Sequence, residues 1–100
     1  MGVPVILTPR AQEDLQEIVR FIRRDSPDRA RSFGHTLIQQ ALALGPFPEA
    51  GRTVPELNDL GVREIIHGTY RIIYEVLPDP PRIYILRFWH GARGEPRLSE

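Results

Sequence analysis

The feature that most constrains the fold of this chain is a pair of apolar runs joined by a two-residue turn signal. Residues 62–67 and 70–77 are rich in isoleucine, valine and tyrosine, which favour strands. Gly68 and Thr69 separate the two runs, and a two-residue loop is the commonest connection in a β-hairpin. The sequence therefore predicts an antiparallel hairpin with a fixed register.

The predicted register places two arginines on different faces of the sheet. A two-residue loop pairs His67 with Tyr70, and side chains alternate between the faces along each strand. Continuing that pairing puts Arg63 and Arg71 on opposite faces. One of the two is therefore a candidate for a structural ion pair with Glu64, Glu75 or another carboxylate, and the sequence leaves open which one.

Two amphipathic helices are predicted before the hairpin. Thr8 and Ser26 are suitable N-caps, and each precedes a proline that can occupy the first helical position. The second helix is expected to stop at Gly45, which precedes another proline. The apolar residues that recur at helical spacing are Leu15, Ile18, Val19 and Ile22 in the first helix, and Ala30, Phe33, Leu37, Ala41 and Leu44 in the second.

Shorter segments complete the predicted order of elements. Residues 3–7 form a short apolar strand, and residues 45–61 form a loop rich in proline and glycine. The prolines of residues 78–81 turn the chain into a last strand over 82–90. The tail, residues 94–100, is expected to be frayed.

This order predicts an α+β fold built as a two-layer sandwich. The elements run β-α-α-β-β-β, with a helical hairpin packed on a mostly antiparallel four-stranded sheet. The length of 100 residues suits one domain, residues 1–100.

Composition excludes several functional classes. The chain has no cysteine, which excludes thiol catalysis, disulfides and cysteine-type zinc sites, and we expect no cofactor or metal. All 13 basic residues are arginine, so no lysine can act as a base, and zero net charge excludes a global basic field. The apolar run near the N-terminus is too short for a membrane span, so we expect a cytoplasmic protein.

Arginines embedded in the apolar strands indicate an anion site. An unpaired guanidinium on a half-buried sheet costs stability, so Arg71 and Arg87 are expected to bind a negatively charged group. Alternation along the last strand places Arg87 with Trp89 on one face, and His90 on the other, unless the strand is bulged near its end.

Six sequence segments together resemble the RelE/ParE toxin superfamily, in an order that spans nearly the whole chain. The segments are Ala11–Leu15, Gly51–Arg52, Pro55–Leu57, Val62–Ile65, Tyr70–Val76 and His90–Arg93. The resemblance implies the toxin half of a bacterial type II toxin-antitoxin module, with a cognate antitoxin as partner. RelE-like and YoeB-like members cut messenger RNA in the ribosomal A site, whereas ParE-like members poison DNA gyrase, and both share one fold.

The resemblance also implies roles for individual residues in metal-free RNA cleavage. Glu56 falls at the position of a glutamate base, Arg71 matches a strand arginine, and His90 lies near the C-terminal acid. The residues expected to hold phosphate or nucleic acid are Arg63, Arg87 and Arg93. Ribosome-dependent mRNA cleavage is our first hypothesis, and a gyrase inhibitor without catalytic activity is the alternative.

A cluster of arginines near the turn between the helices has two interpretations. The cluster comprises Arg20, Arg23, Arg24, Arg29 and Arg31, interleaved with two aspartates. It is either a solvated face or the surface on which an antitoxin or a gyrase subunit docks.

Overall fold

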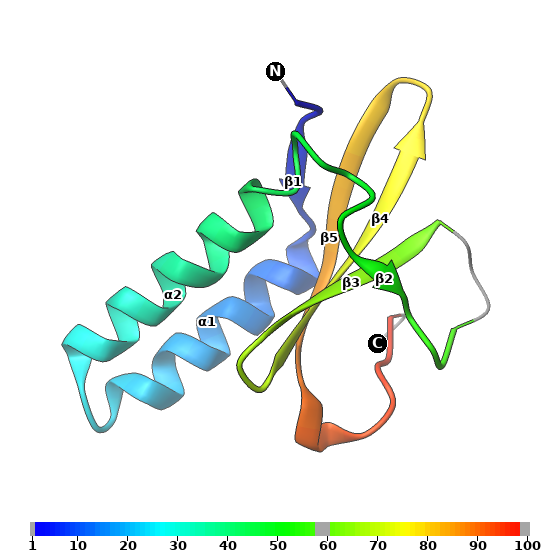
Figure 1. The fold of residues 1–100 in the computed structure, drawn as a ribbon. Coiled ribbons are helices and arrows are strands. Elements are labelled where there is room, and N and C mark those ends of the chain that lie inside the picture. The colour runs from blue at the N-terminus through cyan, green and yellow to red at the C-terminus, as the bar shows by residue number, and fades with distance from the viewer. Residues whose placement is uncertain (1, 58–60, 99–100) are drawn as a thin grey trace.

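The computed structural model describes residues 2–57 and 61–98 and consists of two helices and a five-stranded sheet (Figure 1). The elements are β1 (Val5–Leu7), α1 (Pro9–Arg23), α2 (Pro27–Leu42), β2 (Arg52–Thr53), β3 (Val62–His67), β4 (Tyr70–Pro78), β5 (Pro81–His90) and a 3₁₀ turn over Gly91–Arg93. The strand order across the sheet is β1-β5-β4-β3-β2, in which β1 and β5 are parallel and the other pairs are antiparallel.

Both helices begin at the predicted caps. The hydroxyl of Thr8 accepts a hydrogen bond from the backbone N–H three residues later, and Ser26 does the same, each at 3.2 Å. Each cap satisfies one of the donors that a helix N-terminus leaves unpaired. Helix α2 ends at Leu42, before the predicted stop at Gly45. From Leu42 to Gly45 the backbone continues as hydrogen-bonded turns.

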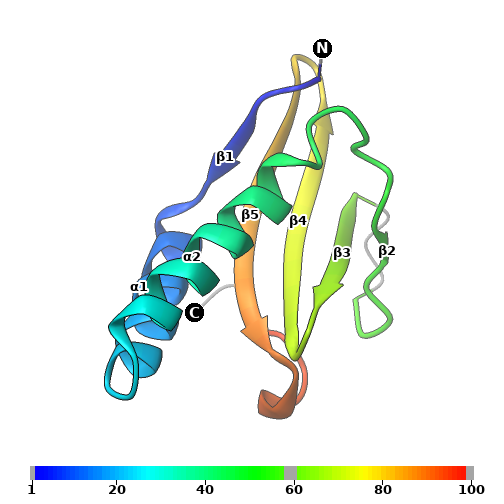
Figure 2. The same ribbon diagram turned by 60° about the vertical axis from the view of Figure 1, so that its left-hand side comes forward.

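The larger core lies between the two helices and one face of the sheet (Figure 2). Ile72 and Tyr74 of β4 and Leu37 of α2 are fully buried there. The helices approach closely at Gly34, where an added Cβ would lie 2.8 Å from Val19 Cγ2. Packing of these apolar faces fixes the helical hairpin against the sheet.

A smaller core covers the opposite face of the sheet. It contains Val54, Val62, Ile73 and Trp89, and Leu98 from the chain end packs against it. The tail, residues 94–100, was predicted to be frayed, but residues 94–98 fold back over this face, where the Trp89 indole N–H donates to the Gly94 carbonyl at 3.0 Å. Residues 99–100 lie outside the described part of the chain. The tail thus shields the apolar surface of that face from solvent.

The sheet differs from prediction in strand number, since it has five strands rather than four. The extra strand, β2, has only two residues, both exposed, so no apolar pattern marked it in the sequence. β1 joins the far edge by pairing Val5 with Ile83 in parallel. The α+β class and the packing of the helical hairpin agree with prediction.

The predicted hairpin register is confirmed. His67 pairs with Tyr70, and Arg63 pairs with Tyr74 across β3 and β4. The β4–β5 ladder shifts by one residue, so that Leu86 has no partner in it. This bulge lies before Arg87 and leaves the alternation from there to His90 intact.

Candidate functional site

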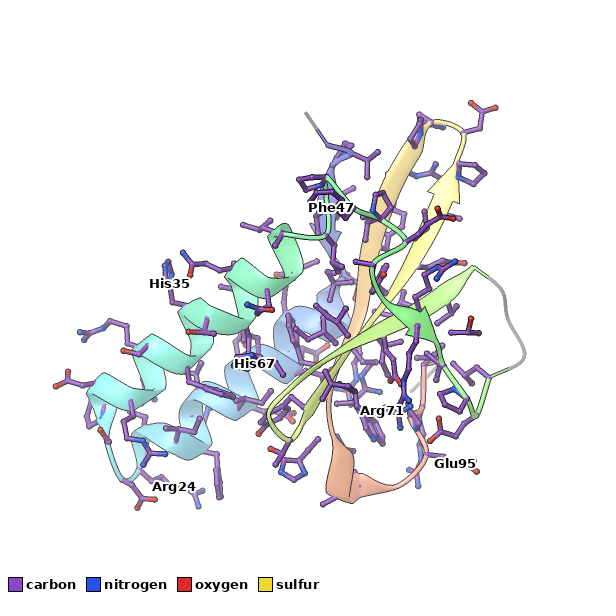
Figure 3. The ribbon with its side chains drawn as sticks, in the orientation of Figure 1. Arg24, His35, Phe47, His67, Arg71 and Glu95 are labelled. Carbon is purple, nitrogen blue, oxygen red and sulfur yellow. The ribbon has the colours of Figure 1, made fainter. Side chains whose placement is uncertain are left out.

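Arg71 lies at the centre of an ion-pair network on the sheet face opposite the helices (Figure 3). Its two terminal nitrogens donate to both oxygens of Glu56, at 2.9 and 2.8 Å, and its Nε donates to Glu64 Oε1 at 2.5 Å. The other oxygen of Glu64 accepts from Arg52 at 2.8 Å. Four elements thus meet here, because Arg52, Glu64 and Arg71 come from β2, β3 and β4, and Glu56 from the turn after β2.

The network balances its own charge. It contains two arginines and two glutamates, and the Glu64 side chain is fully buried between Arg52 and Arg71. Burial of a carboxylate is tolerated only when such partners surround it. In this conformation the Arg71 guanidinium is therefore already neutralised by carboxylates.

The hydrogen bonds of this network shift the pKa values of Glu56 and Arg71. The hydrogen bonds from Arg71, assisted by the charge of Arg52, lower the pKa of Glu56 to about 2. The hydrogen bonds to Glu56 and Glu64 raise the pKa of Arg71 above its ordinary value. Glu56 is thus a carboxylate at neutral pH with little tendency to take up a proton.

His90 lies on the opposite face from this network. It pairs with Tyr70 across the β4–β5 ladder, whereas Arg71 pairs with Trp89, so the two side chains alternate to different faces. The Nδ1 of His90 accepts from the Ala92 N–H at 3.0 Å, and the ring meets Tyr70 edge-on at 5.0 Å.

A cavity of about 160 Å³ adjoins His90 on the helical side of the sheet. It lies between α1 and the paired ends of β4 and β5, and Phe21, Tyr70 and Phe88 supply aromatic walls. Glu17 and Arg93 add one charge of each sign. Neither Glu56 nor Arg71 borders this cavity, so the predicted catalytic trio is not brought together.

Arg63, predicted to hold phosphate, binds the loop before β2. Its Nη1 donates to the Gly51 carbonyl at 2.8 Å, and its Nη2 lies 3.8 Å from Glu49 Oε1. Tyr74 fixes the same loop, donating to the Pro48 carbonyl at 2.9 Å. Arg63 therefore has a structural role here.

Arg87, also predicted to hold phosphate, is fully buried. Its guanidinium pairs with both oxygens of Asp14 on α1, at 2.7 and 3.0 Å, and a further nitrogen donates to the Arg97 carbonyl. The Phe88 N–H donates to the same carboxylate at 3.1 Å. Arg87 is thus a buried cation that already pairs with a carboxylate in this structure.

Arg93 is the remaining phosphate candidate, and its side chain is exposed. Its guanidinium carbon lies 4.2 Å from the centroid of the Trp89 ring, within the range of a cation–π contact. Among the described residues, no three histidine, aspartate or glutamate side chains converge to hold a metal ion.

Asp14 was missed as a member of a buried ion pair, whereas Glu64 was among the carboxylates expected to pair with Arg63 or Arg71, and it pairs with Arg71. Asp14 lies between Ala11 and Ile18 at helical spacing, so an acid on the apolar stripe of the helix was visible in the sequence. Glu64 sits in the strand predicted at 62–67, between the arginine and the isoleucines. An acid at a buried position signals a cationic partner.

Residues 5–94 match the family model described as the ParE toxin of the type II toxin-antitoxin system, parDE. The chain belongs to the ParE toxin family. Residues 5–94 of this ParE-family toxin run from β1 to the residue after the 3₁₀ turn and include every predicted site residue.

Two solved structures share the fold of this ParE-family toxin. A chain of the chromosomal ParDE system from P. aeruginosa superposes with a TM-score of 0.73 at 21% identity, covering 89% of this chain and 96% of that one. A chain of the RelBE2 toxin-antitoxin complex from Mycobacterium tuberculosis gives 0.68 at 23% identity, covering 90% and 92%.

A search of curated protein sequences found no match to this ParE-family toxin. In the described part of the toxin, neither helix has the length and apolar character needed to cross a membrane.

Proposed function

We propose that this ParE-family toxin inhibits growth in the cytoplasm by binding DNA gyrase and performs no chemistry itself. The observation that carries this proposal is the separation of the residues that RNA cleavage would need. Glu56 and Arg71 lie on one face of the sheet and His90 on the other. A base and an acid must both reach one phosphodiester, and side chains that leave the sheet in opposite directions do not meet that requirement.

The protonation state of Glu56 supports the same proposal. General-base catalysis works best when the pKa of the base is near the working pH, and the pKa of Glu56 is about 2. Its carboxylate is also occupied by two hydrogen bonds from Arg71. A base in this state gives little assistance to the 2′-OH of RNA.

The state of the three arginines predicted to hold phosphate is a further argument. Arg63 binds a loop carbonyl and Arg87 is buried against Asp14. Of the three arginines predicted to hold phosphate, Arg93 alone has an exposed side chain. A single exposed arginine is a weak clamp for the charge that develops on a cleaved phosphate.

Ribosome-dependent cleavage of mRNA is the second candidate function, and one observation favours it. Arg71 and Glu56 pair near the surface, with 12% and 28% of their side chains exposed. A phosphate that replaced Glu56 on Arg71 would leave a released carboxylate beside the bound anion. On the ribosome, this rearrangement would create the base that the free toxin lacks.

The two candidate functions are separated by gyrase assays and by the Glu56→Gln variant. We expect the purified wild-type toxin to inhibit DNA supercoiling by gyrase, and its induction in cells to raise a DNA-damage response with intact mRNA. Glu56→Gln should retain full toxicity, since the gyrase proposal gives Glu56 no catalytic role and glutamine keeps the size of the side chain. Ribonuclease activity would be established instead if gyrase were unaffected, new mRNA 5′ ends appeared at fixed codon positions, and the Glu56→Gln variant lost its toxicity.

We also infer that a cognate antitoxin binds this toxin. Residues 5–94 match the family model of a toxin from a toxin-antitoxin system, and a cell that makes such a toxin needs a protein that neutralises it. Phe21, Phe47 and Ile66 are large apolar side chains at the surface, exposed at 67%, 69% and 54%, and are available for contacts with such a partner. Co-expression with the protein encoded beside the toxin should restore growth and yield a stable complex, whereas continued growth arrest would contradict the inference.

A further inference from the structure

Positive charge is concentrated at one end of the molecule. Residues 20–31 contain five arginines and two aspartates, which gives a local net charge of +3 in a chain whose total is zero. The rest of the chain therefore carries −3. We name these five residues the arginine tip, which consists of Arg20, Arg23, Arg24, Arg29 and Arg31.

The arginine tip projects away from the sheet. It comprises the last turn of α1, the connecting turn and the first turns of α2, and Figures 1 and 2 show this hairpin end extending beyond the strands. Arg24 is labelled at this turn in Figure 3. All five side chains are exposed.

Most of the arginine tip has no internal counter-ion. Within residues 2–57 and 61–98, Arg31 is the one member with an ion pair, to Asp28 at 3.8 Å, and both of these side chains are more than four-fifths exposed. Arg71 and Arg87, by contrast, are each held by carboxylates at 3.0 Å or less. Arg71 and Arg87 are thus neutralised within the fold, whereas the arginines of the tip are available to an external anion.

Helix stability explains only part of this arrangement. Arg20 and Arg23 lie in the last turn of α1, where the helix dipole favours cations. Arg29 lies in the first turn of α2, where the helix dipole disfavours a cation. Helix stability therefore does not account for Arg29.

We propose that the arginine tip contacts the phosphate backbone of duplex DNA held by gyrase. The proposal rests on the gyrase function argued above, because the enzyme supplies the DNA. Guanidinium groups are well suited to phosphate, and backbone contacts need positive charge but no sequence-reading side chain. The tip would anchor the toxin beside the DNA while other surfaces contact the protein.

An acidic protein segment is the competing ligand for the tip. A cavity of about 300 Å³ beside α1 is lined by Leu15 and Val19, with Arg20 and Arg23 at its edge. Such a groove suits an apolar and acidic peptide. It accounts for two of the five arginines, whereas a DNA backbone engages charges spread around the whole turn, so the observations favour DNA.

The test compares two variants of equal net charge. Arg24→Gln/Arg29→Gln removes two positive charges from the tip, and Gln39→Glu/Gln40→Glu adds two negative charges at the exposed far end of α2. Binding of the full chain to a fluorescent 30-base-pair duplex is measured by anisotropy over a series of salt concentrations. Circular dichroism checks that each variant is folded.

We expect the tip variant to differ from both the wild type and the control. Two lost phosphate contacts should reduce the slope of log affinity against log salt by about 1.8, while the control keeps the wild-type slope. Equal slopes for the two variants, or no salt-dependent binding by the wild type, would overturn the proposal. Unchanged DNA binding with a weakened antitoxin complex would likewise overturn it and assign the tip to an acidic protein.

Gyrase assays separate this inference from the function on which it rests. If the tip variant still binds DNA-free gyrase but is recruited less well to the gyrase–DNA complex, the DNA contact is supported. If the wild-type toxin leaves gyrase unaffected while the predicted salt slopes hold, the backbone contact stands and the gyrase function fails.

Discussion

At the scale of single residues, the roles of the arginines matter most, because arginine is a structural cation at some positions and an exposed surface charge at others. Arg87 is a buried structural cation, whereas Arg93 is exposed. Burial separates these roles, and burial is decided by residues far away in the sequence. Asp14, the partner of Arg87, is 73 residues distant.

Removal of the charge of Asp14 should strongly destabilise the fold. Asp14→Asn removes the carboxylate charge that pairs with the buried Arg87 guanidinium, and breaking a buried pair in this way costs about 3–5 kcal/mol. Urea unfolding measures the change. Glu17→Gln, an exposed neutralisation on the same helix, is the control and should shift the free energy of unfolding by less than about 0.5 kcal/mol.

The shifted pKa of Glu56 predicts acid sensitivity in a defined window. The folded-state pKa is about 2, below the ordinary value of 4.5, so the pair with Arg71 stabilises the fold fully above about pH 4.5. That contribution is lost as the pH falls from 4.5 toward 2. The stability difference between wild type and Glu56→Gln should shrink over this range, as measured by urea unfolding at several pH values.

A direct titration provides the check on this prediction. The carboxyl carbon resonance of Glu56, followed by NMR, should have its midpoint near pH 2. A midpoint close to 4.5 would mean that the Arg71 pair does not persist in solution.

At the scale of elements, the contact between the helices depends on one missing side chain. Alanine is normally a better helix former than glycine, but a Cβ at Gly34 would lie 2.8 Å from Val19 Cγ2. Gly34→Ala should therefore lower the free energy of unfolding by about 1–3 kcal/mol, since β-branched valine has little freedom to move aside.

The Val19→Ala/Gly34→Ala double variant tests this explanation. Shortening residue 19 makes room for the new methyl group, so the double variant should be more stable than Gly34→Ala alone. Thermal unfolding of the four proteins of the cycle gives the coupling energy. Additive effects would place the cost of Gly34→Ala elsewhere.

The elements that could be predicted from the sequence are those specified by neighbouring residues. Thr8 and Ser26 cap the helices, and Gly68 with Thr69 sets the hairpin register, all through local contacts. β2 could not be predicted in this way, because two exposed residues become a strand only by pairing with β3. The opposed faces of Arg63 and Arg71 followed from local alternation, and Glu64 was among the expected partners, whereas Gly51 and Glu56 belong to segments whose positions depend on the tertiary fold.

At the scale of the whole molecule, the sheet separates two cores of unequal size, and the smaller one is completed by the tail. Pro96 is buried, Leu98 packs against the smaller core, and the Gly94 carbonyl accepts from Trp89. These contacts make residues 94–98 part of the folded body.

Deletion of residues 95–100 should therefore loosen the smaller core. Losing the apolar contacts of Leu98 and Pro96 is expected to lower the free energy of unfolding by roughly 1–3 kcal/mol. Trp89 is the single tryptophan, so its fluorescence reports on this site, and its emission should shift to longer wavelength. An unchanged spectrum would show that the tail is dispensable for this core.

The parallel pairing of β1 with β5 has a consequence for synthesis of the toxin. Val5 pairs with Ile83, so β1 leaves the ribosome well before β5, the strand with which it pairs. At a translation rate of about 5–20 residues per second, the interval lasts several seconds. This edge of the sheet therefore forms only after β5 has been synthesised, and any surface that depends on it appears late.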